Sequence, residues 1–280
     1  DITDPVTTSM FPQEVFSSGS LVSLAKVSYS GTFEGGNHSI ALNLSGGLCT
    51  APFSAVNGAT IRNLSVTGRI AASDMFAAGL VGIVLINAVT IDHCQSSVAI
   101  TSTVDGEGNH GGLVGDATAP VKINNCVFSG SITGVKTNQC GGLVGWIGTN
   151  GAGSKITNCL NTATYSVNGS GSNSVAVNAQ NATISNVYFL NALGDIPAGA
   201  EQVSDAQMKS GYVAWHLQNG QSSAVWGQSI NGTRTDAAPL FSTEAAKKVY
   251  RVAHVSSLDD KVMQEKFYNA GQKAEGLSTA

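Results

Sequence analysis

One short pattern of polar and apolar positions recurs along the middle of the chain. In each copy a polar residue precedes an isoleucine, two polar residues follow, and a leucine, cysteine or valine closes the pattern. The copies lie about 30 residues apart, at residues 60–64, 90–94, 122–126, 155–159 and 183–187. A repeat of this period is typical of solenoid proteins, in which each unit packs on its neighbours.

A second pattern, Gly-Leu-Val-Gly, alternates with the first at residues 79–82, 112–115 and 142–145. Between the two patterns, apolar residues follow strand-like rather than helical spacing, and Gly, Asn and Ser bound them. A turn of about 30 residues holds three short strands and three bends, and stacking such turns about 4.8 Å apart pairs strands in parallel. The sequence therefore predicts an all-β fold, a right-handed parallel β-helix with a small α+β cap at its C-terminal end.

Two side-chain columns follow from stacking the repeats. Asparagine, replaced once by His93, recurs at one position, and cysteine recurs at the next position in three of the copies. We interpret the asparagines as an amide ladder at a bend and His93 as one rung of it, not as a ligand. Because buried cysteine behaves as a small apolar residue, we expect Cys94, Cys126 and Cys159 to be reduced thiols facing the interior.

Composition changes along the chain indicate four segments. After the repeats the chain becomes richer in charge, and Ser204 is placed to cap a helix over 204–219. Strands are expected at Val225–Trp226 and 248–252, and a solvated helix over 256–270. We expect an N-terminal cap and first turns at 1–59, the repeat core at 60–191, a C-terminal capping segment at 192–255, and a charged tail or linker helix at 256–280.

Charge and hydropathy exclude two kinds of partner. The chain has 14 Lys and Arg residues and a net charge of -4, whereas nucleic-acid binding needs clustered positive charge. No run of 18 or more apolar residues occurs, so this segment is not expected to insert into a membrane.

Residues for catalysis or metal binding are sparse. Asp92 is the one carboxylate in the outward column beside the repeated isoleucines, whereas acid/base catalysis by β-helix enzymes needs two or three carboxylates together. The string from Asp105 to Asn109, followed by Asp116, has the spacing of a calcium loop, but a predicted strand at 112–115 would hold Asp116 out of reach. We predict no catalytic residue, no metal site and no cofactor.

Loops of variable length precede each Gly-Leu-Val-Gly strand and lie side by side on one edge of the predicted coil. Loops on a regular scaffold are where recognition commonly occurs. Trp146, just after the third of these strands, and Tyr165 have flat rings that suit a sugar. They are the candidate ligand contacts.

The repeated Gly-Leu-Val-Gly strings, the Ile-x-Asn-Cys strings and the opening Gly-Thr-Phe-Glu-Gly-Gly-Asn-His-Ser-Ile at 31–40 resemble the Glug-motif family of bacterial surface proteins. The stretch at 209–217 is similar to the segment that closes the coil in such chains. The resemblance implies an extracellular, cell-surface or secreted multi-domain parent protein, and a non-catalytic module for adhesion or for binding a glycan or host protein. Two alternatives stay open: a carbohydrate-active enzyme, as a polysaccharide lyase or glycoside hydrolase, and a structural spacer between neighbouring domains.

Overall fold

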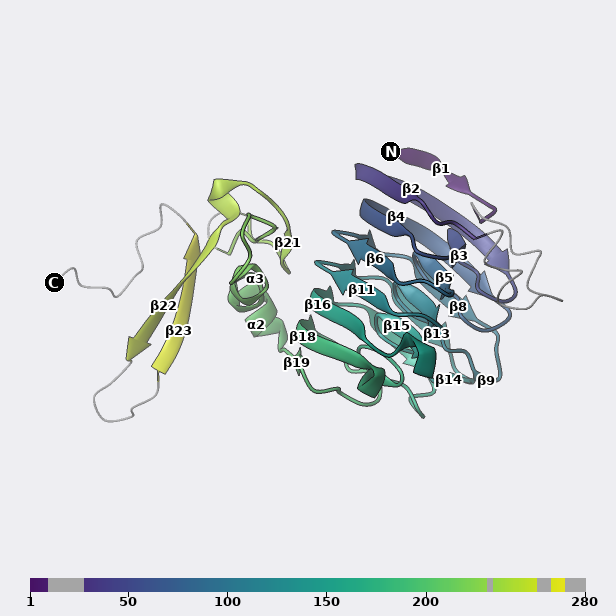
Figure 1. Cartoon of the computed structure of the whole chain (residues 1–280). Helices are drawn as coiled ribbons and strands as arrows, with labels where there is room; N and C mark the ends of the chain where they lie inside the picture. Colours follow the sequence, from purple (N-terminus) through teal and green to yellow (C-terminus); the bar gives the residue numbers. More distant parts are fainter. Residues whose placement is uncertain (10–27, 231–233, 256–262, 270–280) are drawn as a thin grey trace. The chain divides into compact units, whose positions relative to one another are not determined.

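The structure, a computed structural model, describes residues 1–9, 28–230, 234–255 and 263–269. The chain forms two compact units, Asp1–Gln202 and Val203–Ala280. The first unit is a parallel β-solenoid of about five turns, whose strands stack one above another (Figure 1). The predicted fold class is confirmed. Residues 192–202, assigned from sequence to the C-terminal capping segment, belong to the coil unit.

The main sheet of the coil contains 13 strands. Strand β4 pairs in succession with β6, β7 and β8, so a long strand in one turn becomes three short strands separated by bends in the next. The strands are β1 (Ile2–Val6), β2 (Thr32–Gly46), β4 (Thr60–Ala72), β6 (Val89–Asp92), β7 (Gln95–Ser96), β8 (Ala99–Ser102), β11 (Val121–Asn124), β12 (Val127–Phe128), β13 (Ser131–Gly134), β16 (Ser154–Asn161), β17 (Thr164–Val167), β18 (Ala182–Phe189) and β19 (Ala200–Gln202).

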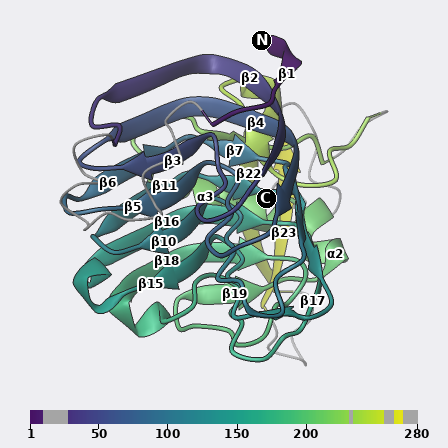
Figure 2. The same cartoon turned by 90° about the vertical axis from the view of Figure 1, so that its right-hand side faces the viewer.

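The Gly-Leu-Val-Gly strings lead into a separate four-stranded sheet (Figure 2). Its strands are β3 (Phe53–Val56), β5 (Val81–Val84), β10 (Val114–Ala117) and β15 (Val144–Ile147). A two-stranded sheet is formed by β9 (Gly106–Glu107) and β14 (Thr137–Asn138), which lie in the chain between strands of the main sheet and strands of the four-stranded sheet. The first unit also contains two short 3-10 turns, η1 (Thr149–Gly151) and η2 (Ala179–Asn181).

The register of the main sheet matches the sequence repeat residue by residue. Ile61 pairs with Ile91, Ile91 with Ile123, and that column continues through Ile156 to Ile184. The first four side chains are at most 1 % exposed and belong to the core of the coil. Burial of this continuous apolar column stabilises the stack, because each isoleucine is removed from water by the turns above and below.

The asparagine column is set by backbone conformation. Asn63, Asn125, Asn158 and Asn186 have φ between 49° and 54°, and His93 has φ of 51°. Asparagine tolerates this left-handed conformation better than most residues. The amide ladder is present in part, since Asn186 donates to Asn158 at 2.7 Å, while Asn158 donates onward to Asn124 at 3.1 Å.

The predicted thiol column is confirmed. Cys94, Cys126 and Cys159 are unbridged and 0 % exposed. Each Sγ lies 3.1–3.4 Å from the carbonyl oxygen two residues earlier, at the bend. A thiol at this position fills the core and also donates weakly to a bend carbonyl, which valine or leucine cannot do.

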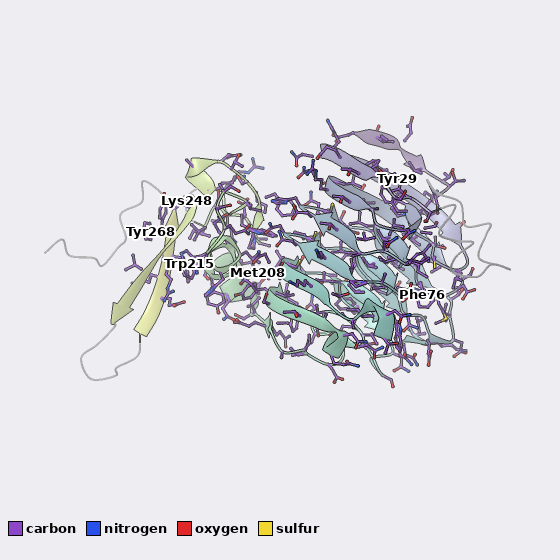
Figure 3. The ribbon with its side chains drawn as sticks, viewed as in Figure 1. Tyr29, Phe76, Met208, Trp215, Lys248 and Tyr268 are labelled. Atoms are coloured by element: carbon purple, nitrogen blue, oxygen red, sulfur yellow. The ribbon has the colours of Figure 1, made fainter. Side chains whose placement is uncertain are left out.

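At the N-terminal end of the coil, aromatic rings pack over the first turns. Phe53 of β3 contacts Phe33 and Tyr29 with ring centroids 5.2 and 5.7 Å apart, and Tyr29 lies among these first turns (Figure 3). Together with β1, which pairs with β2, these rings pack against the apolar core at this end of the coil.

The second unit combines short helices and hairpins: α2 (Asp205–Lys209), α3 (Tyr212–Gln218), β20 (Trp226–Gly227), β21 (Leu240–Phe241), η3 (Ala245–Lys247), β22 (Val249–Val255) and β23 (Met263–Asn269). Ser204 forms the predicted N-cap, in a capping box with Gln207. The expected single helix over 204–219 is instead two helices, because the chain turns at Gly211 with φ of 88°.

The C-terminal hairpin differs from the sequence prediction. Residues Met263–Asn269 form a strand antiparallel to β22, not the solvated helix expected over 256–270, and the rest of that stretch lies outside the described residues. Cross-strand packing outweighs the helical composition here: Tyr250 and Tyr268 stack with centroids 5.5 Å apart. On the other face, Arg251 lies 4.7 Å from the ring of Trp215, next to the hairpin (Figure 3).

Candidate functional site

Trp146 stands on the outer surface of the four-stranded sheet. Its neighbours Val144 and Ile147 are buried in the core, whereas its own ring is partly exposed. The register places it beside Asp116 of the previous turn. The ring is therefore positioned where a ligand could contact it.

Asp116 is a buried carboxylate, and its spacing in the sequence suggested only a role as a calcium ligand. It lies on β10 between Ile83 and Trp146 and is 5 % exposed. Its Oδ1 atom has no hydrogen-bond partner among the described residues, and burial raises the pKa of this carboxyl group to about 7. The protonated form is therefore well populated at neutral pH.

The other acidic residues of the proposed calcium loop are engaged with the next turn. Asp105 accepts a hydrogen bond from Lys136 at 2.9 Å, and Glu107 accepts one from Gln139 at 2.8 Å. Within the described part of the chain, no three His, Cys, Asp or Glu side chains gather to hold a metal ion. These contacts connect successive turns.

Tyr165 turns toward the interior of the coil. It pairs with Ile132 and packs against the core. Its hydroxyl group exchanges hydrogen bonds with the buried Asn161, at 2.7 and 2.9 Å, and burial raises the pKa of the phenol. The ring of Tyr165 is thus less accessible to a ligand than its sequence position indicates, because the sequence spacing does not show on which face the ring lies.

The outward column that contains Arg62 and Asp92 holds a second carboxylate that the sequence did not indicate, because Glu34 pairs with Arg62 in the preceding turn. Arg62 pairs with Glu34 at 2.6 Å. Asp92 accepts hydrogen bonds from His93 at 2.8 Å and Asn124 at 2.9 Å. Although burial opposes it, these hydrogen bonds lower the pKa of Asp92. Both carboxylates are thus engaged in ladder contacts, and neither is free to act in an acid/base pair.

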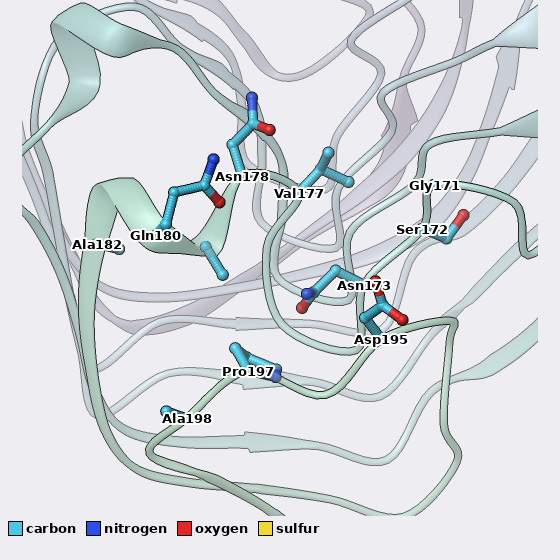
Figure 4. A pocket seen from close by; sticks show the side chains of 11 residues that line it. Gly171, Ser172, Asn173, Val177, Asn178, Gln180, Ala182, Asp195, Pro197 and Ala198 are labelled. Carbon is cyan, nitrogen blue, oxygen red and sulfur yellow. The ribbon is translucent and has the colours of Figure 1, made fainter.

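A groove of about 510 Å³ lies at the last turn of the coil (Figure 4). One wall is the loop that leads into η2, and the other is the loop before β19. Its lining includes Asn173, Val177, Asn178, Gln180, Asp195 and Pro197.

The groove exists because the chain stops adding strands to the four-stranded sheet. Asn173 still pairs with Asp195 of the next turn. Two residues later stands Pro197, which has no N–H to continue the parallel pairing. Asn173 Oδ1 accepts instead from the backbone N–H groups of Val175 and Ala176, at 2.9 and 3.1 Å. The chain then passes to β19, and the groove remains between the two loops.

The groove walls are held by the coil, while several of the side chains in it are free. Asn181 donates to the carbonyl oxygen of Ile147 at 2.9 Å and so fixes the η2 loop to the preceding turn. The side chains of Asn178, Gln180 and Asp195 form no hydrogen bond with other described residues. Together they offer hydrogen-bond donors and acceptors to a ligand in the groove.

Sequence reasoning missed these groove residues. The available signal was the loss of Gly-Leu-Val-Gly in the fifth turn, where Val175-Ala176-Val177 stands, followed by Pro197. By itself, this loss indicates that the coil nears its end and not that a groove forms there. No protein-family model, curated protein or solved structure matches the chain.

Proposed function

We propose that this chain is a non-catalytic binding module of an extracellular bacterial surface or secreted protein, and that it acts in adhesion or in binding a glycan or a host protein. The observation that supports binding is the groove with its unbonded side chains on a hydrogen-bonded scaffold. Sites of this size, roughly 300–1,000 Å³, are typical of ligand recognition. The surface location rests on the resemblance to Glug-motif proteins.

Two further observations agree with this proposal. The described part of the chain contains no helix with the length and apolarity of a membrane span. In the charged column, Glu34 is paired with Arg62, and Asp92 is hydrogen-bonded to His93 and Asn124, so both carboxylates already have partners within the coil. Neighbouring domains of a larger chain would then carry the attachment to the cell.

A variant that fills the groove tests the proposal. Ala198 lines it and is exposed, so Ala198→Trp is expected to block ligand entry without disturbing the core. Binding of the whole chain to a glycan array and to host matrix proteins would be compared with that of Ala71→Trp, a matched change at an exposed strand position.

The proposal predicts that the intact chain binds at least one ligand and that Ala198→Trp alone abolishes it. A chain that binds nothing, or one that Ala198→Trp leaves unaffected, would support the spacer alternative instead.

A further inference from the structure

We infer that the groove at the last turn binds an uncharged saccharide, an inference that rests on the proposed binding function and specifies the ligand class for the same site. Three ligand classes compete for such a groove: ions, extended peptides and neutral polyhydroxylated molecules. The charges, the backbone edge and the free side chains of the groove distinguish them.

The described lining of the groove carries little charge that could bind an ionic ligand. Among the residues that the structure describes, no Lys, Arg or His lines the groove, so an anion would lack a counter-charge. Asp195 is the one carboxylate among the described lining residues, and its side chain is exposed. A single exposed carboxylate gives a cation little affinity, because one surface ion pair contributes only about 0–1 kcal/mol.

An extended peptide would bind by adding a strand to the open sheet edge, which requires free backbone donors. The N–H groups of Val175 and Ala176 are already bonded to Asn173 Oδ1. On the opposite wall, Pro197 has no N–H to donate. The edge is therefore blocked at the point where a peptide strand would start to pair.

The free polar groups and the apolar surface of the groove suit a neutral saccharide. Sugar hydroxyl groups both donate and accept, and the side-chain amides of Asn178 and Gln180 do the same. The free amino group of the Asn173 amide adds a donor and the Asp195 carboxylate adds an acceptor, while the partly exposed Pro197 and the exposed Ala198 supply apolar surface for the C–H faces of a ring. These polar groups approach the groove from both walls (Figure 4).

Four variants of the whole chain test the ligand class. Asn178→Gly and Gln180→Ala each remove a hydrogen-bonding amide from the groove, and glycine is used at position 178 because φ there is 58°. Asn150→Ala removes an exposed amide from the η1 turn outside the groove and serves as the matched control. Asp195→Asn keeps an acceptor of the same shape but removes the negative charge. The probes are immobilised oligosaccharides that end in neutral hexose or N-acetylhexosamine, together with carboxylated and sulfated counterparts and a set of extended peptides.

We expect binding to neutral oligosaccharides, a loss of affinity of about 5–10-fold for Asn178→Gly and for Gln180→Ala, and wild-type affinity for Asn150→Ala. Asp195→Asn should lower affinity by no more than about tenfold, because it weakens one charge-assisted hydrogen bond but keeps the acceptor. Binding only to charged probes or peptides, or its abolition by Asp195→Asn, would overturn the saccharide assignment while leaving a binding module. Binding that no groove variant alters would overturn the assignment and the proposed function together.

Discussion

Single residues in the left-handed conformation shape the bends of this coil. One series consists mostly of asparagine, as the repeat predicted, and runs from Asn63 to Asn186. A second series, at the bend before each strand of the four-stranded sheet, consists of Cys49, Phe76, Asn109 and Gln139, with φ between 47° and 65°. Only the first series has a composition that reveals the conformation, so the second could not be predicted from the sequence.

Asn158 allows the two contributions of a bend asparagine to be separated. Its side chain bonds to Asn124 and Asn186, and its φ is 53°. Asn158→Gly loses the bonds but keeps an easy left-handed backbone, whereas Asn158→Ala loses both. We expect the alanine variant to be less stable than the glycine variant by about 1 kcal/mol in urea unfolding. Equal stabilities of the two variants would show that Asn158 stabilises the coil only through its side-chain hydrogen bonds and not through its backbone conformation.

Asp116 should make the stability of the coil depend on pH. Its folded-state pKa of about 7 exceeds the value of about 3.9 in an unfolded chain. The folded state therefore holds the proton more tightly, and this group's contribution to the free energy of unfolding falls as pH rises from about 4 to about 7, then levels off. We expect Asp116→Asn to remove this dependence and to be more stable than the wild type near pH 8, by roughly 1–4 kcal/mol.

Urea denaturation of both proteins near pH 5 and near pH 8 checks this prediction. The difference between wild type and variant isolates Asp116 from the other titrating groups. If that difference were the same at both pH values, the carboxyl group would be ionised and solvated in the folded protein, contrary to its 5 % exposure.

At the scale of the strand, glycine allows the loops to pack against the four-stranded sheet. A Cβ added to Gly115 would lie 2.2 Å from the carbonyl oxygen of Phe76 and 2.6 Å from that of Gly82. Both neighbours are backbone atoms, which cannot rotate away. The glycines of the Gly-Leu-Val-Gly strings are therefore needed for close approach of neighbouring turns.

Gly115→Ala is expected to destabilise the coil by about 3 kcal/mol or more, because the backbone of two turns must shift. Gly169→Ala is the control, since a Cβ there would meet nothing within 4 Å. Thermal unfolding followed by circular dichroism would compare the two variants. A Gly115→Ala protein as stable as the control would show that the loops do not lie on the strands as described.

The sequence predicted the elements of the coil well, because stacking forces one residue type to recur at one position. The isoleucine and cysteine columns could be predicted from the sequence for this reason. Tyr165 lies outside the five-residue pattern, and its inward orientation depends on the register of β17 against β13. The two helices and the β23 strand depend on Gly211 and on cross-strand packing, which composition alone does not reveal.

At the scale of the first unit, the groove arises from the way in which the repeat ends. Four turns contribute a strand to the smaller sheet, the fifth contributes only a bridge at Ala176, and Pro197 prevents further pairing. The site is thus a consequence of a missing strand, and a missing strand has no sequence motif. This explains why the regular repeat predicted the scaffold but not the candidate site.

The most direct test of this account maps the ligand on the molecule. Nuclear magnetic resonance of the isotope-labelled chain, titrated with the oligosaccharide that binds best, would follow the side-chain amide signals of Asn173, Asn178 and Gln180. We predict that these signals shift with ligand concentration while the indole signal of Trp146 and the amide signal of Asn150 stay unchanged. Shifts centred on Trp146, with the groove amides unmoved, would contradict the central claim that the end of the coil is where this protein binds.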